Sequence, residues 1–168
     1  TGGMQPGHNV LLLDRWTDIG MVMTELNAAW FFGIGCNRPV GADLKRLMPS
    51  FPYEVLGHVS QSFDAVTLLR SQEAAAEVHL LAEFSKTSRT CWVRVGESEI
   101  WVGLYVPPRS QPESARAEVA LTMFEEWDTV RAHFPRGSVR MRGCGDLNMS
   151  DSLLQVFNKQ FALRGLEW

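Results

Sequence analysis

Cysteine is scarce in this sequence of 168 residues, and the few copies are not paired. The three cysteines, Cys36, Cys91 and Cys144, form no CxxC pair and show no spacing typical of a metal site. An odd, unpaired set favours reduced thiols over a disulfide framework. We therefore expect an intracellular protein, either nuclear or cytoplasmic.

Long apolar runs and glycine-rich phosphate loops are also missing. The early apolar run NVLLL (9–13) stops at Asp14, too soon for a signal peptide or a membrane span. We therefore expect no membrane partner. Neither GxGxxG nor GxxxxGK(S/T) occurs, which excludes a P-loop nucleotide site.

Positive charge is not in excess either. The net charge is −3 at pH 7, so attraction to a phosphate backbone alone does not favour tight nucleic-acid binding. Basic residues still gather in two places, and a solvated surface is the simpler interpretation of each. One group is Arg131, Arg136, Arg140 and Arg142, and the other is Lys86, Arg89 and Arg94.

What is present fits a folded domain. The hydrophobic content of 45% and the charged content of 21% lie near globular averages, and no stretch has the composition of a linker. We predict one domain over residues 1–168. Because the chain begins with Thr rather than Met, we expect it to be a fragment of a longer protein.

Hydrophobic periodicity predicts helices toward both ends and strands between them. The first part is predicted as a strand at 9–13, a helix capped by Thr17, a strand at 30–35, a loop at 37–41 and a short helix at 42–48. Further strands are predicted at 53–59, 63–70, 77–84, 90–96 and 99–106, with a hairpin at 96–99. This order predicts an α/β fold whose helices cover the outer faces of sheets.

The last third contains the clearest helix, over 113–134. Its apolar residues fall at steps of three and four: Ala120, Met123, Phe124, Trp127, Val130 and Phe134. A strand at 138–143 and a helix capped by Asp151 and closed by Gly165 follow. The predicted buried side of that last helix consists of Leu153, Leu154, Phe157 and Phe161.

The segment GCGDLNMSD (143–151) carries the first candidate chemistry. Asp146 and Asn148 are two residues apart and would point the same way if the strand continued. A carboxylate can accept a proton from water or bind a hard cation, and an amide can donate to an anionic oxygen, as attack on phosphate requires. Because Asp and Asn are common in turns, an ordinary turn is the alternative.

Two further residues are candidates. Tyr105 ends the strand in LYVPP (104–108), where the two prolines would hold its hydroxyl in place as a donor to a developing oxyanion. An ordinary core aromatic is its alternative. Asn9 begins the first predicted strand, where a cap or turn is the default interpretation.

Together, HNVLLL, IWVGLYVPP, the long helix and VRMRGCGDLNMSD resemble the endonuclease/exonuclease/phosphatase superfamily, which includes DNase I. The specific motifs are GDLN after a strand and YVPP before a long helix, and the resemblance covers nearly the whole chain. The stretches VGLYVPPRSQPESARAEV and FEEWDTVRAHFP are most similar to the endonuclease domains of non-LTR retrotransposons, which accompany a reverse transcriptase.

The resemblance implies a DNase I-like, four-layer α/β/β/α sandwich with its site at one rim. It also implies hydrolysis of phosphate esters that depends on Mg²⁺, or on Mn²⁺ in its place, with DNA as the expected partner. Asp146 would orient and deprotonate the attacking water and could bind the metal. Asn148 would hold an oxygen, Tyr105 would donate to the phosphate, and Asn9 would position metal and phosphate.

Two departures from the family pattern weaken this expectation of activity. Cys36 stands where the family has a metal-binding Glu, and a neutral thiol is a doubtful ligand for hard Mg²⁺. The family also closes with an Asp-His pair, which would begin about where this chain ends at RGLEW (164–168). None of the four histidines matches it. We therefore expect the final strand or strands to be missing, an open sheet edge, and weak or absent activity.

Three interpretations stay open at this point. The chain is a phosphodiesterase completed by a C-terminal extension, or a catalytically dead remnant that acts as a structural or binding module. In the third, it is an unrelated α/β domain whose GDLN is a turn, and Tyr105 would then lie far from Asp146. The sequence indicates no oligomeric state.

Overall fold

The computed structural model describes residues 21–27, 30–34, 53–61, 64–71, 77–87 and 89–166, and for 30–34, 53–61 and 64–71 it describes the backbone alone. The predicted strand at 9–13, loop at 37–41 and helix at 42–48 lie outside these residues, as do Asn9 and Cys36. Within the predicted first helix, residues 21–25 are helical, and Met23 is buried.

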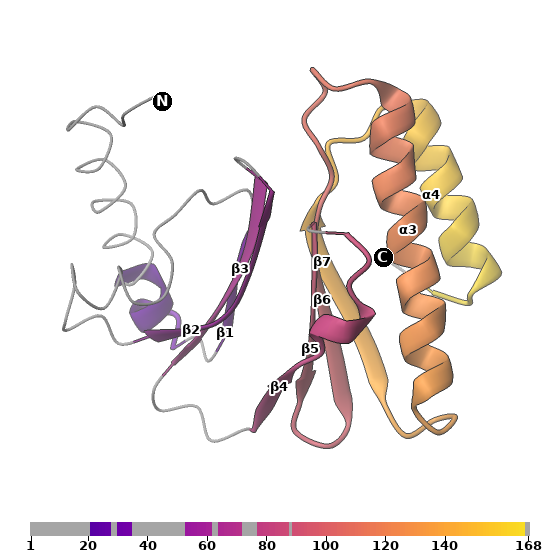
Figure 1. Cartoon of the computed structure of the whole chain (residues 1–168). Helices are drawn as coiled ribbons and strands as arrows, with labels where there is room; N and C mark the ends of the chain where they lie inside the picture. The colour runs from indigo at the N-terminus through magenta and orange to yellow at the C-terminus, as the bar shows by residue number, and fades with distance from the viewer. Residues whose placement is uncertain are drawn as a thin grey trace, which may run out of the picture.

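Two sheets form the middle of the molecule (Figure 1). The first contains β1 (Trp30–Ile34), β2 (Tyr53–Gln61) and β3 (Asp64–Ser71), in the antiparallel order β1-β3-β2. The second contains β4 (Val78–Leu80), β5 (Thr90–Val95), β6 (Glu99–Tyr105) and β7 (Arg140–Asp146), in the order β4-β5-β6-β7. Strands β1 and β3 approach β6, and β2 and β3 approach β5, so the sheets face each other. Only the β6–β7 pair is parallel among the described strands.

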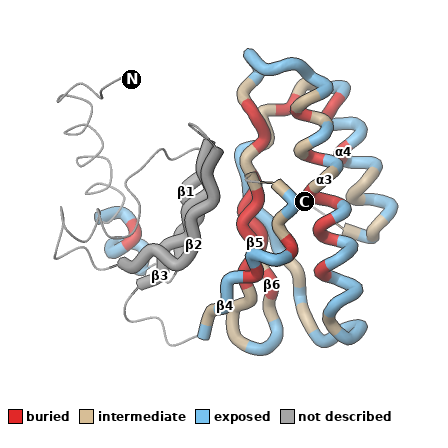
Figure 2. Tube along the Cα trace, viewed as in Figure 1, coloured by how far each residue is buried: buried red, intermediate tan, exposed pale blue. Residues whose placement is uncertain are grey.

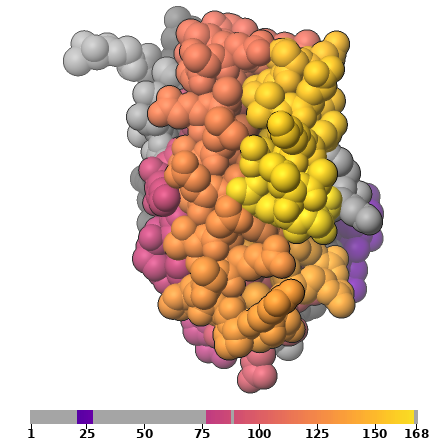
Figure 3. All heavy atoms as spheres, turned by 90° about the vertical axis from the view of Figure 1, so that its right-hand side faces the viewer, coloured from indigo at the N-terminus to yellow at the C-terminus, as the bar shows by residue number. Residues whose placement is uncertain are grey.

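Two helices, α3 (Glu113–His133) and α4 (Asp151–Leu163), cover the other face of the second sheet (Figure 1). They lie side by side on the surface of the molecule (Figure 3). The buried residues gather between this helical layer and the sheet (Figure 2). The core includes Trp92, Ile100, Val102, Leu104, Ala120, Met123, Phe124, Trp127, Val130, Leu153 and Phe157. The described residues thus form three layers, which confirms an α/β fold.

The long helix follows its prediction closely. Five of the six residues of its apolar stripe are buried, and Phe134, just past the helix end, packs against the core. The regular steps of three and four therefore predicted which face is buried. In the described part of the chain, no helix is both long and apolar enough to span a membrane.

Three local predictions were wrong. The strand predicted at 77–84 ends at Leu80, because the chain turns through a 3₁₀ segment, η1 (Ala82–Phe84), that buries Leu81 and Phe84. Ser150 rather than Asp151 caps α4, since its Oγ accepts from the Leu153 N–H. Leu154 is 39% exposed, because α4 buries only the narrower face of Leu153 and Phe157.

Candidate active site

The parallel pairing of β6 and β7 places Tyr105 opposite Asp146 at the ends of both strands. The register begins at Glu99 and Arg140 and runs without a shift to this last pair. The Val106 N–H donates to the Asp146 carbonyl at 2.9 Å, so the pairing extends one step past β6. Two residues predicted from separate motifs are therefore neighbours at one rim of the sheet.

Gly145 allows β7 to lie this close to β6. A Cβ atom at this position would collide with the carbonyl oxygen of Leu104 on β6. Glycine within a strand is typical of such close backbone approach. The glycine directly before Asp146 thus has a packing reason that is separate from any chemistry.

Asn148 lies beyond the strand and folds back against β6. Its φ of 39° is in the left-handed region, which asparagine tolerates better than most residues. Its N–H donates to Asp146 Oδ1 at 3.3 Å, and its Nδ2 donates to the Val106 carbonyl at 3.0 Å. The strand ends at Asp146, so the condition under which Asp146 and Asn148 would project from one strand face is not met. A turn brings the two side chains to the same rim instead.

The exposure of the three side chains suits contact with a ligand. Asp146 is exposed, whereas Tyr105 and Asn148 are half-buried. The guanidinium of Arg89 lies 5.9 Å from the centre of the Tyr105 ring and adds positive charge beside it. The rim thus combines a carboxylate that water can reach with an amide and a phenol next to it.

Two arginines that the sequence analysis did not single out hold the loop after Asp146. Arg116, on α3, is 6% exposed, and its Nη1 donates to the Asn148 carbonyl at 2.7 Å. Arg109 Nη2 donates to the Met149 carbonyl at 2.9 Å. A sequence signal for Arg116 did exist, because it lies four residues before Ala120 and extends the apolar stripe of α3 with a charge.

A second set of contacts ties the start of α4 to the start of α3. The hydroxyls of Ser150 and Ser152 donate to the Glu113 carboxylate at 2.9 and 2.7 Å. These hydrogen bonds hold the pKa of Glu113 below its usual range, the bond from Ser152 having the larger effect. The loop that carries Asn148 is therefore held by Arg116 at Asn148 and by Glu113 at Ser150.

The described residues do not by themselves fit a metal ion. No three His, Cys, Asp or Glu side chains among them gather in a way that could hold one. His79 pairs with Glu77 at 3.1 Å, and His133 stacks against Phe84 and Phe134. Neither of these histidines lies at the rim with Asp146, in agreement with the sequence expectation for them.

Two facing sheets and a helical layer define the class of this α/β fold, and solved structures have a similar fold. No protein-family model and no curated protein sequence matches the chain. Similar structures are those of TDP2, tyrosyl-DNA phosphodiesterase 2, a DNase I-like member of the endonuclease/exonuclease/phosphatase superfamily. The likeness supports the predicted DNase I-like α/β fold, whereas it does not show the predicted four-layer sandwich or the similarity to retrotransposon endonucleases.

Three of these structures give the extent of the likeness. Humanized D. rerio TDP2 with 14 mutations has a TM-score of 0.56 and 13% identity over 92% of this chain and 64% of its own. Truncated Caenorhabditis elegans TDP2 has a TM-score of 0.56 and 17% identity over 84% of this chain and 58% of its own. Selenomethionine TDP2 from the same organism has a TM-score of 0.54 and 16% identity over 84% and 44%. The chain thus spans less than two thirds of these proteins, and the likeness concerns the fold alone.

Proposed function

We propose that this chain carries a phosphodiesterase- or endonuclease-type site that acts on phosphate esters, with DNA as its substrate. The observation that supports this most is the convergence of Tyr105, Asp146 and Asn148, from two separate motifs, at one rim of a DNase I-like fold. In the proposal, the exposed Asp146 carboxylate accepts a proton from the attacking water. Tyr105 and Asn148 donate to phosphate oxygens as charge develops on them.

We also propose that the complete fold is a four-layer sandwich and that Asn9 lies at this rim. We propose further that the chain is related to the endonucleases of retrotransposons. The proposal also includes dependence on Mg²⁺ or Mn²⁺, which would neutralise charge on the phosphate. Because the described residues supply no set of three metal-binding side chains, we derive no step from a bound metal. With Cys36 in place of a carboxylate, we propose that activity is weak.

The experiment is nicking of supercoiled plasmid by the 168-residue chain over a titration of Mg²⁺. We expect slow nicking that requires the metal and falls at least about tenfold in Asp146→Asn, in line with the cost of losing one catalytic group. Asp151→Asn is the matched control, because it removes an exposed carboxylate five residues away in the first turn of α4. Equal nicking by wild type and Asp146→Asn would refute the assignment of Asp146.

A catalytically dead remnant that binds DNA without cleaving it is the second candidate. It is favoured by the structural bonds of the same residues: Asp146 accepts from the Asn148 N–H, and the Asn148 amide donates to Val106. This candidate predicts no nicking at any Mg²⁺ concentration and DNA binding that Asp146→Asn leaves unchanged. A gel-shift titration beside the nicking assay separates the two candidates.

A further inference from the structure

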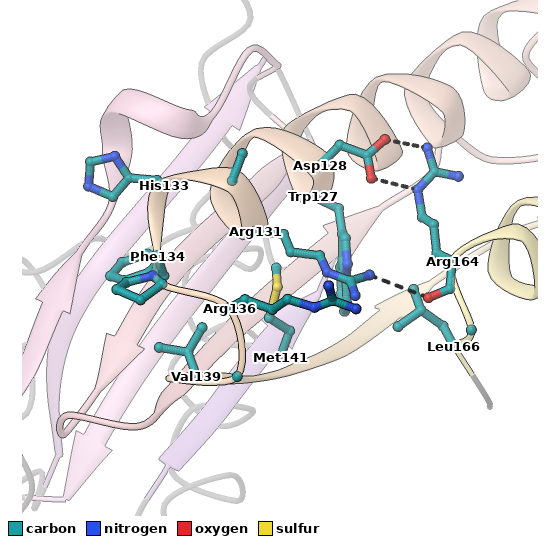
Figure 4. Close-up of a pocket in the computed structure, with 14 residues that line it drawn as sticks. Trp127, Asp128, Arg131, His133, Phe134, Arg136, Val139, Met141, Arg164 and Leu166 are labelled. Carbon is teal, nitrogen blue, oxygen red and sulfur yellow. Dashed lines mark hydrogen bonds and ion pairs between the residues drawn. The ribbon is translucent and has the colours of Figure 1, made fainter.

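A pocket of about 860 Å³ lies at the end of β7 away from Asp146. It opens to solvent and is lined by the end of α3, the turn into β7 and the end of α4 (Figure 4). The five residue steps from Met141, in its wall, to Asp146 span about 16 Å of strand. The pocket is therefore separate from the candidate active site, and nothing proposed for that site uses it.

The lining carries positive charge in a protein that is negative overall. Among the fourteen lining residues are three arginines and one acidic residue, which leaves two positive charges when His133 is neutral. Asp128 forms a bidentate ion pair with Arg164, whose Nε and Nη2 donate to Oδ1 and Oδ2 at 2.9 and 2.6 Å. Arg131 and Arg136 hold the two remaining charges.

Arg131 and Arg136 point into the same part of the pocket, near Trp127 (Figure 4). Arg131 makes one long hydrogen bond, from Nη1 to the Arg164 carbonyl at 3.4 Å. No described residue forms an ion pair or side-chain hydrogen bond with Arg136. Both arginines are exposed. The carbonyls at the end of α3 offset about half a charge, and no described acidic side chain balances the remainder.

Trp127 forms part of the apolar wall of the pocket beside these two arginines. The residue is 5% exposed and lines the pocket with its ring, and its Nε1–H is itself buried and has no hydrogen-bond partner among the described residues. A ligand in the pocket would therefore meet the indole ring rather than its N–H, while the two guanidiniums favour an oxygen acceptor with negative charge.

We propose that this pocket binds a phosphate monoester carried on an apolar or aromatic body. At pH 7 such a group has a charge of about −1.5 to −2, which matches the two uncompensated arginines better than a carboxylate does. The planar guanidinium fork suits phosphate oxygens. The rest of the wall is largely apolar and would cover the body of the ligand: Trp127, Phe134, Pro135, Val139, Met141 and Leu166.

The test is calorimetric titration of the 168-residue chain with phenyl phosphate, inorganic phosphate and benzoate. We expect saturable binding of phenyl phosphate that is at least several-fold tighter than that of the other two probes. Arg131→Gln and Arg136→Gln should each weaken it about tenfold, the effect of one charge-assisted hydrogen bond.

Arg140→Gln is the matched control, because Arg140 is an exposed arginine of the same region that does not line the pocket. It should change the affinity less than twofold, and thermal melts should show that every variant is folded. Absence of saturable phenyl phosphate binding would overturn the proposal, as would an equal loss in Arg140→Gln and Arg136→Gln. Either result leaves the proposed function of the Asp146 rim untouched, because that rim is tested by nicking.

Discussion

Asn148 is the residue at which a turn and a candidate site coincide. Its backbone is in the left-handed region, and its side-chain amide is bound to Val106 on the neighbouring strand. From the sequence alone, a turn and a site are alternatives for this segment. The structure shows that one residue can satisfy the turn and still hold an amide at the rim beside Asp146.

Replacement of Asn148 separates its two structural contributions. Asn148→Ala removes the hydrogen bond to Val106 and puts at positive φ a residue that tolerates this backbone region less well than asparagine, so we expect a loss of about 1–3 kcal/mol in the free energy of unfolding. Asn148→Gly removes the same bond without the backbone strain and should lose less. Urea denaturation measures both variants, and equal stability of Asn148→Ala and wild type would contradict the contacts described.

The cysteines should differ in reactivity. Cys91 is 1% exposed, and burial raises the pKa of its thiol from 9.0 to about 12. Cys144 is exposed on β7, although partial desolvation raises the pKa of its thiol as well. In the folded chain, a maleimide should therefore modify Cys144 and leave Cys91 unmodified, because attack requires an accessible thiolate. Peptide mass mapping reads out the two sites.

The same shift gives a prediction for stability against pH. Since folding raises the pKa of Cys91, its contribution is fully present below about pH 9 and is lost as the pH rises toward 12. The melting temperature should fall over this range, and more steeply in wild type than in Cys91→Ala. Parallel pH profiles for the two proteins would contradict the burial of this thiol.

At the scale of elements, α3 contacts neighbouring segments through two buried charged residues, Arg116 and Glu126. Its apolar stripe was predictable because an amphipathic helix repeats every 3.6 residues. Arg116 and Glu126 were not predicted as buried, since their partners come from segments 32 to 40 residues away in the chain. The hydrophobic pattern of a helix predicts which of its faces is buried. Whether a charged side chain can be buried depends on hydrogen-bond partners from distant segments, which the pattern does not contain.

Glu126 anchors η1 and β5 to α3. Its carboxylate is fully buried and accepts from the Trp92 indole at 2.8 Å and from the N–H groups of Lys86 and Thr87. Glu126→Ala removes the acceptor of the buried Trp92 indole N–H and of the part-buried N–H groups of Lys86 and Thr87, so we expect a loss of about 3–5 kcal/mol. Glu125→Ala is the matched control, because the neighbouring carboxylate is exposed and its pair with Lys86 contributes less than about 1 kcal/mol.

Arg116 should control the order of the loop that carries Asn148. Arg116→Met keeps the buried aliphatic part of the side chain and removes the donor to the Asn148 carbonyl. We expect the Asn148 and Met149 amides to exchange with solvent faster, while amides in the middle of β5 keep their protection. Uniformly faster exchange throughout the sheet would mean that Arg116 supports the whole fold rather than this loop.

At the scale of the whole molecule, the fold was more predictable than the site. The described strands and helices lie within a few residues of their predicted positions, because alternation and helical periodicity are local signals. The prediction of a strand over 77–84 was wrong in its second half, because the chain turns there and buries Leu81 and Phe84 in the core. The Tyr105–Asp146 pairing needed the family resemblance, because 41 residues separate them in sequence and only the parallel register joins them.

The central claim is that DNA phosphate is recognised at the rim formed by Tyr105, Asp146 and Asn148. The most direct test is a residue-resolved NMR titration of the labelled chain with a short DNA duplex in the presence of Mg²⁺. We predict that the largest saturable shifts fall on the amides of 104–106 and 145–149, whether or not the DNA is cleaved. Saturable shifts that leave these amides unchanged, or no shifts at all, would contradict the claim.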